Sequence, residues 1–349
     1  MRERVENILR AAIEFKASDI HLTVGVPPIF RINGDIKRYG KDILMPNDTE
    51  EIAKLIIPEN LYDTFKEKGE LDFSYGIPGV SRFRVNAYHQ RKSVALALRV
   101  VASKTPTIEA LDMPKIVSEF MEKPQGLILV TGPTGSGKST TLAAMIDYMN
   151  RTMRKHIITL EDPIEYLHKH GNSIIDQREV GFDTNNYASG LKAALRQDPD
   201  VILVGEMRDL ETMSIAITAA ETGHLVLGTL HTSSAPSTIN RIIDVFPAEQ
   251  QPQIRIQLAS VLVGVISQRL FPTTDGKGRK AATEILVNNP AIANLIRNEK
   301  IHQIQSTMQT SRAQGMHTLE MSIRELLDRN QIQKEAASKY LHEKMMMDA

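Results

Sequence analysis

The sequence contains no cysteine and no tryptophan. Without cysteine it can form neither a disulfide bond nor a zinc site built from thiolates. Lysine and arginine together number 42, as do aspartate and glutamate, so the formal net charge is zero. This balance, with an aromatic content of 5%, argues against a protein that mainly coats nucleic acid. We expect no nucleic-acid partner.

The sequence also lacks a long hydrophobic run. The longest, at 258–266, is much shorter than the roughly 18 residues that a membrane-spanning helix needs. The opening stretch, MRERVENILRAAIEF, mixes acids among its apolar residues and does not resemble a signal peptide. We therefore expect a cytoplasmic protein without direct membrane insertion, which reaches any membrane through a partner.

Length and pattern divide the sequence into two predicted domains. With 349 residues, the chain is long enough for two hydrophobic cores. Residues 1–102 begin with a helical segment and continue with short alternating stretches, and Asn33-Gly34 is typical of a hairpin turn. We expect a small α+β domain there, followed by a polar, proline-containing linker at 103–115.

The pattern changes in residues 116–349. Short apolar runs separated by helical stretches lie at 127–131, 156–160, 201–205 and 224–230. Such runs indicate a parallel sheet covered by helices on both faces, and hence an α/β domain. Its tail, from about residue 249, is predicted to be mostly helical, including 249–270 and 319–327.

Residues 132–139, GPTGSGKS, match the pattern G-x-x-x-x-G-K-[ST] between an apolar strand and a helix. Glycines allow backbone N–H groups to surround phosphate oxygens, and the helix N-terminus attracts the same charge. Lys138 is expected to reach the β- and γ-phosphates, and Ser139 to hold Mg²⁺. The predicted ligands are therefore ATP and Mg²⁺. The residues expected to bind the nucleotide here are Gly132, Pro133, Thr134, Gly135, Ser136, Gly137, Lys138, Ser139 and Thr140.

Acidic residues follow two of the predicted strands. Glu206 comes after VILVG, and Glu161 with Asp162 comes after HIITL. Ligands of open α/β sheets bind at the carboxyl ends of the strands, so these side chains should lie beside the phosphate loop. We predict that Glu206 activates the attacking water and that Glu161 and Asp162 join Ser139 around the metal. The alternative is that these acids only begin helices.

Two histidines lie at opposite ends of one predicted strand. His231 follows the strand at the nucleotide edge and is predicted to sense the γ-phosphate, whereas His224 precedes it. His224 either satisfies local packing or faces a neighbouring subunit. Asp198 and Asp200 also lie at the far end of their strand, and we expect them to be structural.

Arginines of the first domain are candidates for a second contact with the nucleotide. Phosphoryl-transfer sites often use a cation besides the loop lysine. The second domain offers Arg208 and Arg241, and the first offers a cluster that includes Arg84 and Arg99. A solvated sheet face is the alternative interpretation. We predict that the first domain folds over the nucleotide and that Arg84 and Arg99 bind it.

Three further stretches resemble motifs of the type II/IV secretion ATPases, a family that includes the motors of type IV pili. LEDPIEYLH resembles the acidic box, and DPDVILVGEMRDLET resembles a variant second nucleotide motif with Glu at the strand end. TGHLVLGTLHTSSAPSTINRIIDVFP resembles the histidine box. The resemblance covers nearly the whole chain, from ASDIHLTVGVPPIFRINGDI to AIANLIRNEKIHQI.

Within this family the chain resembles the pilus retraction ATPases. Pilus assembly ATPases usually carry extra N-terminal sequence and a four-cysteine zinc loop after the histidine box, whereas this chain has no cysteine and only a short segment at 271–281. The segment AIANLIRNEK resembles a retraction signature that usually reads AIRNLIRE. Ala293 stands where that signature has Arg, and Asn298 where it has Glu.

The resemblance implies a PAS-like N-terminal domain followed by a RecA-like P-loop ATPase domain. It also implies a homohexamer that binds ATP between the domains. Domain closure would rotate an inner-membrane platform protein of the pilus machinery, so that pilins leave the fibre and twitching motility results. An accessory paralogous retraction ATPase, or a pilus or secretion assembly ATPase, is the alternative within the family.

Three functions outside the family share the phosphate loop. A RecA-like DNA motor would need a basic channel studded with aromatic residues, which this composition disfavours. A small-molecule kinase would need an acceptor pocket and a lid, neither of which the sequence indicates. A scaffold that binds ATP without cleaving it would not need Glu206 at a strand end.

Overall fold

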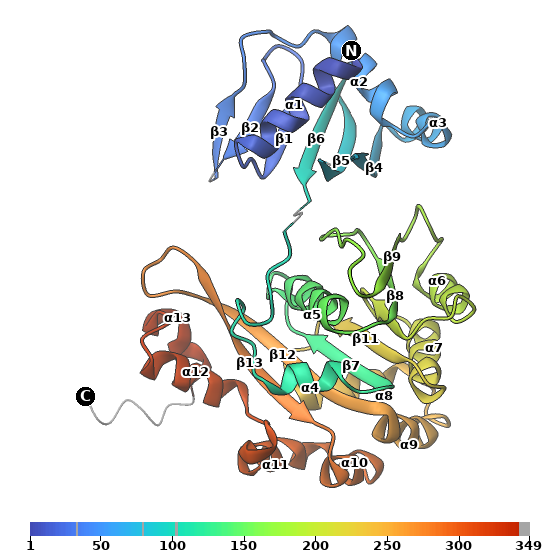
Figure 1. Cartoon of the computed structure of the whole chain (residues 1–349), viewed down its shortest axis with the longest axis vertical. Helices are drawn as coiled ribbons and strands as arrows, with labels where there is room; N and C mark the ends of the chain where they lie inside the picture. The colour runs from blue at the N-terminus through green and yellow to red at the C-terminus, as the bar shows by residue number, and fades with distance from the viewer. Residues whose placement is uncertain (33, 79, 102–103, 342–349) are drawn as a thin grey trace. The chain divides into compact units, whose positions relative to one another are not determined.

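The computed structural model describes residues 1–341 except 33, 79, 102 and 103 (Figure 1). Asn33, half of the expected hairpin turn, lies outside the described residues. The chain divides into two compact units. The first comprises Met1–Lys104 with Glu165–Leu167, and the second comprises Thr105–Ile164 with His168–Ala349.

The first unit is an α+β domain with one six-stranded antiparallel sheet of order β3-β2-β1-β6-β5-β4. Its strands are β1 (Asp19–Leu22), β2 (Ile29–Ile32), β3 (Asp35–Arg38), β4 (Glu70–Ile77), β5 (Ser81–Gln90) and β6 (Ser93–Val100), and its helices are α1 (Arg2–Glu14), α2 (Pro46–Ile56) and α3 (Glu59–Lys68). Alternate residues of β5, such as Phe83 and Val85, are buried in the same core as residues of the helices. Arg84, between them, is exposed, as the period of two in a strand requires.

The second unit is built on a seven-stranded sheet of order β13-β12-β7-β11-β10-β8-β9. Its strands are β7 (Gly126–Thr131), β8 (His156–Glu161), β9 (Ile174–Glu179), β10 (Val201–Val204), β11 (Leu225–Leu230), β12 (Leu262–Pro272) and β13 (Arg279–Val287). Neighbouring strands are parallel except for the pair β12 and β13. The carboxyl ends of the parallel strands therefore meet at one edge.

Helices cover both faces of this sheet (Figure 1). They are α4 (Ile116–Met121), α5 (Lys138–Thr152), α6 (Tyr187–Ala194), α7 (Leu210–Glu221), α8 (Ala235–Val245), α9 (Gln251–Val261), α10 (Pro290–Arg297), α11 (Ile304–Thr310), α12 (Leu319–Asp328) and α13 (Lys334–Ala337). Successive residues of β7 alternate between two cores. Ile128 and Val130 pack with α4 and α5, whereas Leu127 and Leu129 pack with α7, α8 and α9. The prediction of a parallel sheet buried on both faces is confirmed.

The predicted helix at 249–270 is wrong in its second half. α9 ends at Val261, and β12 follows directly. A continuous apolar run does not distinguish a buried strand from a buried helix, and here the β-branched Val263, Val265 and Ile266 favour the strand. β12 pairs with β7 on one side and β13 on the other, so its backbone hydrogen bonds are satisfied within the sheet.

The segment at 103–115, expected to be a linker, contributes to the second unit. Ser103 lies outside the described residues, and Lys104 belongs to the first unit. From Thr105 onward the chain belongs to the second unit, where Ile108 and Met113 are buried against the core under α4 and α5. Among the described helices, none combines the length and apolarity needed to cross a bilayer.

Glu284, in β13, joins two helices of the second unit to the sheet. Its carboxylate accepts hydrogen bonds from the backbone N–H of Ala235 at 2.7 Å and of Leu319 at 3.4 Å. These are the first residues of α8 and α12, whose N–H groups have no partner within their own helices. Glu284 is 5% exposed, and burial raises its pKa.

We expect Glu284→Ala to lower the free energy of unfolding of the second unit by about 1–3 kcal/mol at neutral pH, because two buried N–H groups lose their acceptor. Glu284→Gln keeps an acceptor but cannot ionise. The folded pKa of Glu284 lies above the unfolded value. The stability that comes from keeping this carboxyl protonated is therefore full below the unfolded pKa and is lost as the pH rises through the folded pKa. As the pH rises from 4 to 8, the urea midpoint of the native protein should therefore fall relative to that of Glu284→Gln. Parallel profiles would contradict this assignment.

Candidate active site

The loop at 132–137 joins the end of β7 to the start of α5 and forms a concave turn of backbone. Gly132, Gly135 and Gly137 have φ values of 143°, 78° and 89°, a region that other residues rarely adopt. At Gly132 a Cβ atom would lie 2.4 Å from the Gln268 carbonyl oxygen and 2.6 Å from the Ser136 hydroxyl. Glycine is therefore required there by both conformation and space.

Polar groups of this loop fit a bound phosphate. Lys138 donates hydrogen bonds to the carbonyl oxygens of Gly132 at 2.8 Å and Pro133 at 3.2 Å, so its ammonium group lies over the loop. The Ser136 hydroxyl is buried and has no hydrogen-bond partner among the described residues. Ser139 and Thr140 follow in the first turn of α5, where backbone N–H groups have no intrahelical acceptor. This set of donors suits the phosphates of a nucleotide.

Glu161 is the last residue of β8, and two neighbours hold its carboxylate. Its Oε1 accepts hydrogen bonds from the Thr159 hydroxyl at 2.6 Å and from the Gln177 amide at 3.1 Å. Gln177 lies on the adjacent strand β9. Asp162 follows immediately, so two carboxylates come together at this strand end, where oxygen ligands could hold Mg²⁺.

The structure brings together Glu206 and His231, which follow two different strands. The two strands, β10 and β11, are parallel neighbours, and the Nε2 atom of His231 lies 3.1 Å from Oε1 of Glu206. The same oxygen accepts a hydrogen bond from Arg208. Below this pair, the Thr229 hydroxyl donates to the Gly205 carbonyl oxygen at 2.6 Å and so ties the strand ends together. The carboxylate is held by two cationic or polar partners at the edge where the loop also lies.

Tyr187, the first residue of α6, is a member of this group that the sequence analysis missed. Burial and the carboxylates of Asp162, Glu206 and Glu161 raise its pKa, so the phenol stays protonated and can donate a hydrogen bond. A Cβ atom on Gly205 would lie 3.1 Å from its hydroxyl oxygen. No motif marks this tyrosine in the sequence, because the packing of α6 alone places it here.

Gln268, in β12, is a second residue that the sequence analysis missed. It is 2% exposed, and its amide group donates a hydrogen bond to the Ser136 carbonyl oxygen at 2.7 Å. The Thr141 hydroxyl donates to the Gln268 amide oxygen at 2.9 Å. The sequence predicts a helix for this segment, and these contacts join residues more than a hundred positions apart, so no local pattern marks Gln268.

Residues at the opposite ends of the strands do not join the site. His224 precedes β11, and its Nδ1 atom lies 3.0 Å from the Ala219 carbonyl oxygen of α7. Asp200 precedes β10 and accepts hydrogen bonds from the His156 backbone at 2.8 Å and from Lys155 at 3.2 Å. Both residues therefore have local structural partners.

Arg84 and Arg99 belong to the first unit, whereas the phosphate loop belongs to the second. The two arginines are directly opposite each other on β5 and β6, and both are exposed. Arg99 also donates a hydrogen bond to Asp19 at 2.9 Å. Their contact with a nucleotide stays a prediction.

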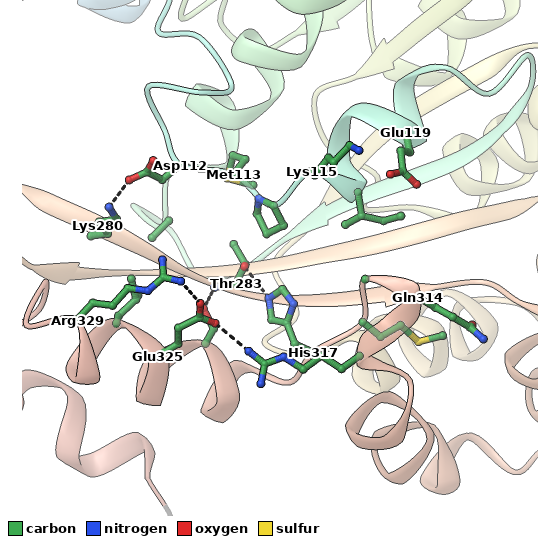
Figure 2. A pocket seen from close by; sticks show the side chains of 18 of the residues that line it. Asp112, Met113, Lys115, Glu119, Lys280, Thr283, Gln314, His317, Glu325 and Arg329 are labelled. Carbon is green, nitrogen blue, oxygen red and sulfur yellow. Dashed lines mark hydrogen bonds and ion pairs between the residues drawn. The ribbon is translucent and has the colours of Figure 1, made fainter.

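A pocket of about 900 Å³ lies elsewhere in the second unit, between residues 109–119, β13 and α12 (Figure 2). Glu325 accepts hydrogen bonds there from Arg312 at 3.3 Å and Arg329 at 2.6 Å, and the His317 ring lies 2.9 Å from the Thr283 hydroxyl. Burial lowers the pKa of His317. None of the residues predicted to bind the nucleotide lines this pocket.

Comparison with known proteins identifies the family. The sequence model of the family described as Type II/IV secretion system protein matches residues 1–346. The chain belongs to this family. The three motif stretches and the phosphate loop thus all lie within the residues that match the family.

Relatives and solved structures match over nearly the whole chain. The Pseudomonas aeruginosa type IV pilus retraction ATPase PilT is 47% identical over 333 residues, which cover 95% of this chain and 96% of the relative. The type IV pilus ATPase PilU of the same organism is 42% identical over 95% of this chain and 87% of its own length. A crystal structure of the pilus retraction motor PilT with bound ADP is 50% identical, with a TM-score of 0.89 and coverage of 97% and 96%. The predicted fold, a RecA-like P-loop ATPase domain after a small PAS-like α+β domain, is confirmed.

We expect Gly205→Ala to reduce ATP turnover about tenfold or more while nucleotide binding is retained. The added carbon would lie 2.9 Å from the Leu160 carbonyl oxygen and 3.1 Å from the Tyr187 hydroxyl, so the strand end that carries Glu206 must shift. Gly278→Ala is the matched control, because its nearest neighbours, atoms of Thr273, lie at 3.7 Å and 3.9 Å. Steady-state phosphate release and ADP titration measure the two effects, and normal turnover in Gly205→Ala would contradict this role of the strand end.

Proposed function

We propose that this chain is a motor ATPase that hydrolyses ATP to drive retraction of a type IV pilus. The observation that carries the proposal is the Glu206–His231 pair at 3.1 Å, at the sheet edge where the phosphate loop also lies. A scaffold that only binds nucleotide would not need a carboxylate there. The identity of 47% to PilT over 95% of the chain supports the choice of pilus retraction. The lower identity of 42% to PilU makes the accessory retraction paralogue the second choice.

In this proposal the loop at 132–140 binds the phosphates and Lys138 neutralises the charge that develops on them. Glu206 orients and deprotonates the attacking water, and His231 holds Glu206 and senses the γ-phosphate. Ser139 would hold Mg²⁺, with Glu161 and Asp162 completing its shell directly or through water. The ion would supply charge neutralisation between the phosphates.

Arg84 and Arg99 are proposed to contact the nucleotide from the first unit. Their register on β5 and β6 presents two guanidinium groups on one exposed sheet face, and guanidinium is well suited to phosphate. Cleavage of the γ-phosphate would remove some of the contacts through which the two units bind the nucleotide. The motion of one unit against the other would then be the mechanical step.

The proposed assembly is a cytoplasmic homohexamer that acts on an inner-membrane platform protein of the pilus machinery. Residues 291–297 of the segment AIANLIRNEK lie in α10, where Ala293 is 6% exposed and packs in the core. Asn294 and Arg297 are exposed, and Asn298 donates hydrogen bonds back to Asn294 at 2.9 Å. A partner contact through this helix would therefore use Asn294 and Arg297, because Ala293 faces inward.

Replacing the proposed base tests the chemistry. Glu206→Gln should bind ATP but cleave it at least about a hundredfold more slowly, since an amide cannot take a proton from water. Glu221→Gln, the same change at the distant end of α7, should behave as the native protein. Filter-bound ATP and released phosphate are followed in the same sample, and unchanged turnover in Glu206→Gln would remove the assignment.

The mass of the purified protein in solution tests whether it assembles into the proposed hexamer. A species near six times 39.0 kDa that releases phosphate steadily is expected in the presence of ATP. The same protein should restore retraction to cells that lack their own retraction ATPase, whereas Glu206→Gln should not. A monomer with full turnover would contradict the ring, and restored retraction by Glu206→Gln would contradict hydrolysis as its energy source.

A further inference from the structure

Gln268 connects the phosphate loop to a strand far away in the sequence. Its amide nitrogen donates to the Ser136 carbonyl oxygen at 2.7 Å, and its amide oxygen accepts from the Thr141 hydroxyl at 2.9 Å. One side chain thus contacts the loop just before Gly137 and the first turn of α5. Gln268 and Thr141 are each 2% exposed, so water does not compete effectively for these bonds.

The bond to Ser136 determines where the next N–H group points. In a trans peptide the C=O and N–H bonds are coplanar and point in opposite directions. Gln268 draws the Ser136 carbonyl toward β12, so the N–H of Gly137 is directed away from β12. Backbone N–H groups of this loop are the donors that a bound phosphate requires. Fixing the Ser136 carbonyl group therefore also fixes the direction of the Gly137 N–H group.

The amide of Gln268 is itself held in a single orientation. A carbonyl oxygen can only accept, so the NH₂ group of Gln268 has to face Ser136. The amide oxygen then faces Thr141, whose hydroxyl can donate to it. Reversing the amide would place its oxygen against the Ser136 carbonyl oxygen. Thr141 therefore stabilises the orientation in which Gln268 donates to the loop.

Two glycines of the loop allow β12 to come this close. A Cβ on Gly132 would lie 2.4 Å from the Gln268 carbonyl oxygen, and a Cβ on Gly137 would lie 3.1 Å from its amide nitrogen. Backbone and side chain of Gln268 thus contact opposite ends of the loop. Larger residues at either glycine would separate the loop from the strand.

We propose that Gln268 is a positioning residue of the nucleotide site, which holds the phosphate loop in its binding shape before the nucleotide arrives. A preformed set of donors costs less ordering when a ligand binds. The proposal rests on the proposed binding of the nucleotide by residues 132–140. We expect Gln268 to increase the affinity for nucleotides that carry a β-phosphate.

Three variants test this proposal by ADP titration of the full chain. Gln268→Met keeps an unbranched side chain but cannot donate to Ser136, and it should raise the Kd for ADP about tenfold. Ser267→Ala is the matched control, because Ser267 is the adjacent buried residue of β12 and faces the other side of the sheet. It should stay within about twofold of the native Kd. Thr141→Val leaves Gln268 in place but removes its orienting donor, and it should raise the Kd about threefold.

The double variant distinguishes positioning from general damage. If Thr141 acts through Gln268, then Thr141→Val added to Gln268→Met should raise the Kd no further, because no amide remains to be oriented. Additive losses, or a native Kd in folded Gln268→Met, would overturn the proposal. If Gln268→Met does not fold, a native Kd in Thr141→Val overturns it instead.

Lys138→Ala separates this proposal from the proposed site. It should abolish ADP binding if residues 132–140 hold the phosphates. Loss of binding in Lys138→Ala together with a native Kd in Gln268→Met would overturn the positioning role alone. Native binding in Lys138→Ala would overturn the site and the positioning role together.

Discussion

Burial of the parallel sheet on both faces is the constraint on which the rest of the second unit depends. Leu127 to Val130 alternate between two cores, so no face of β7 is left for polar chemistry. Functional side chains have to lie where strands end, and parallel strands end at one edge. Glu161, Glu206 and His231 are brought to that edge by β8, β10 and β11 for this reason. The phosphate loop follows the end of β7.

The charged groups at this edge already have partners within the protein. Lys138 donates to carbonyl oxygens of its own loop, and Glu206 is shared by His231 and Arg208. The protonated Tyr187 lies near three carboxylates without adding to their charge. Binding of an anion would compete for the ammonium of Lys138, because a phosphate oxygen is a stronger acceptor than a neutral carbonyl. Binding of a phosphate would therefore exchange hydrogen bonds of Lys138 within the loop for hydrogen bonds to the ligand.

These contacts all lie in the second of the two compact units of the chain. Each unit has its own sheet and its own hydrophobic core. The exposed face of the first sheet carries Arg84 and Arg99 in register, and the second unit carries the phosphate loop. The two departures from the retraction signature are Ala293, which is buried in α10, and Asn298, which follows α10 and donates hydrogen bonds to Asn294. Asn294 and Arg297 are exposed.

The sequence by itself determined the short-range features: the glycine loop between a strand and a helix, the acids that follow VILVG and HIITL, and two domains of different pattern. These depend on neighbours within a few residues, which a linear pattern contains. It did not determine that β12 is a strand, because an apolar run buried on both faces has no period to distinguish it from a helix. Only the tertiary structure decided that Gln268 holds the Ser136 carbonyl, that Tyr187 lies beside Gly205, and that Glu206 contacts His231. Each of these contacts is made by the order of strands in the sheet and the packing of helices on it, which no local spacing encodes.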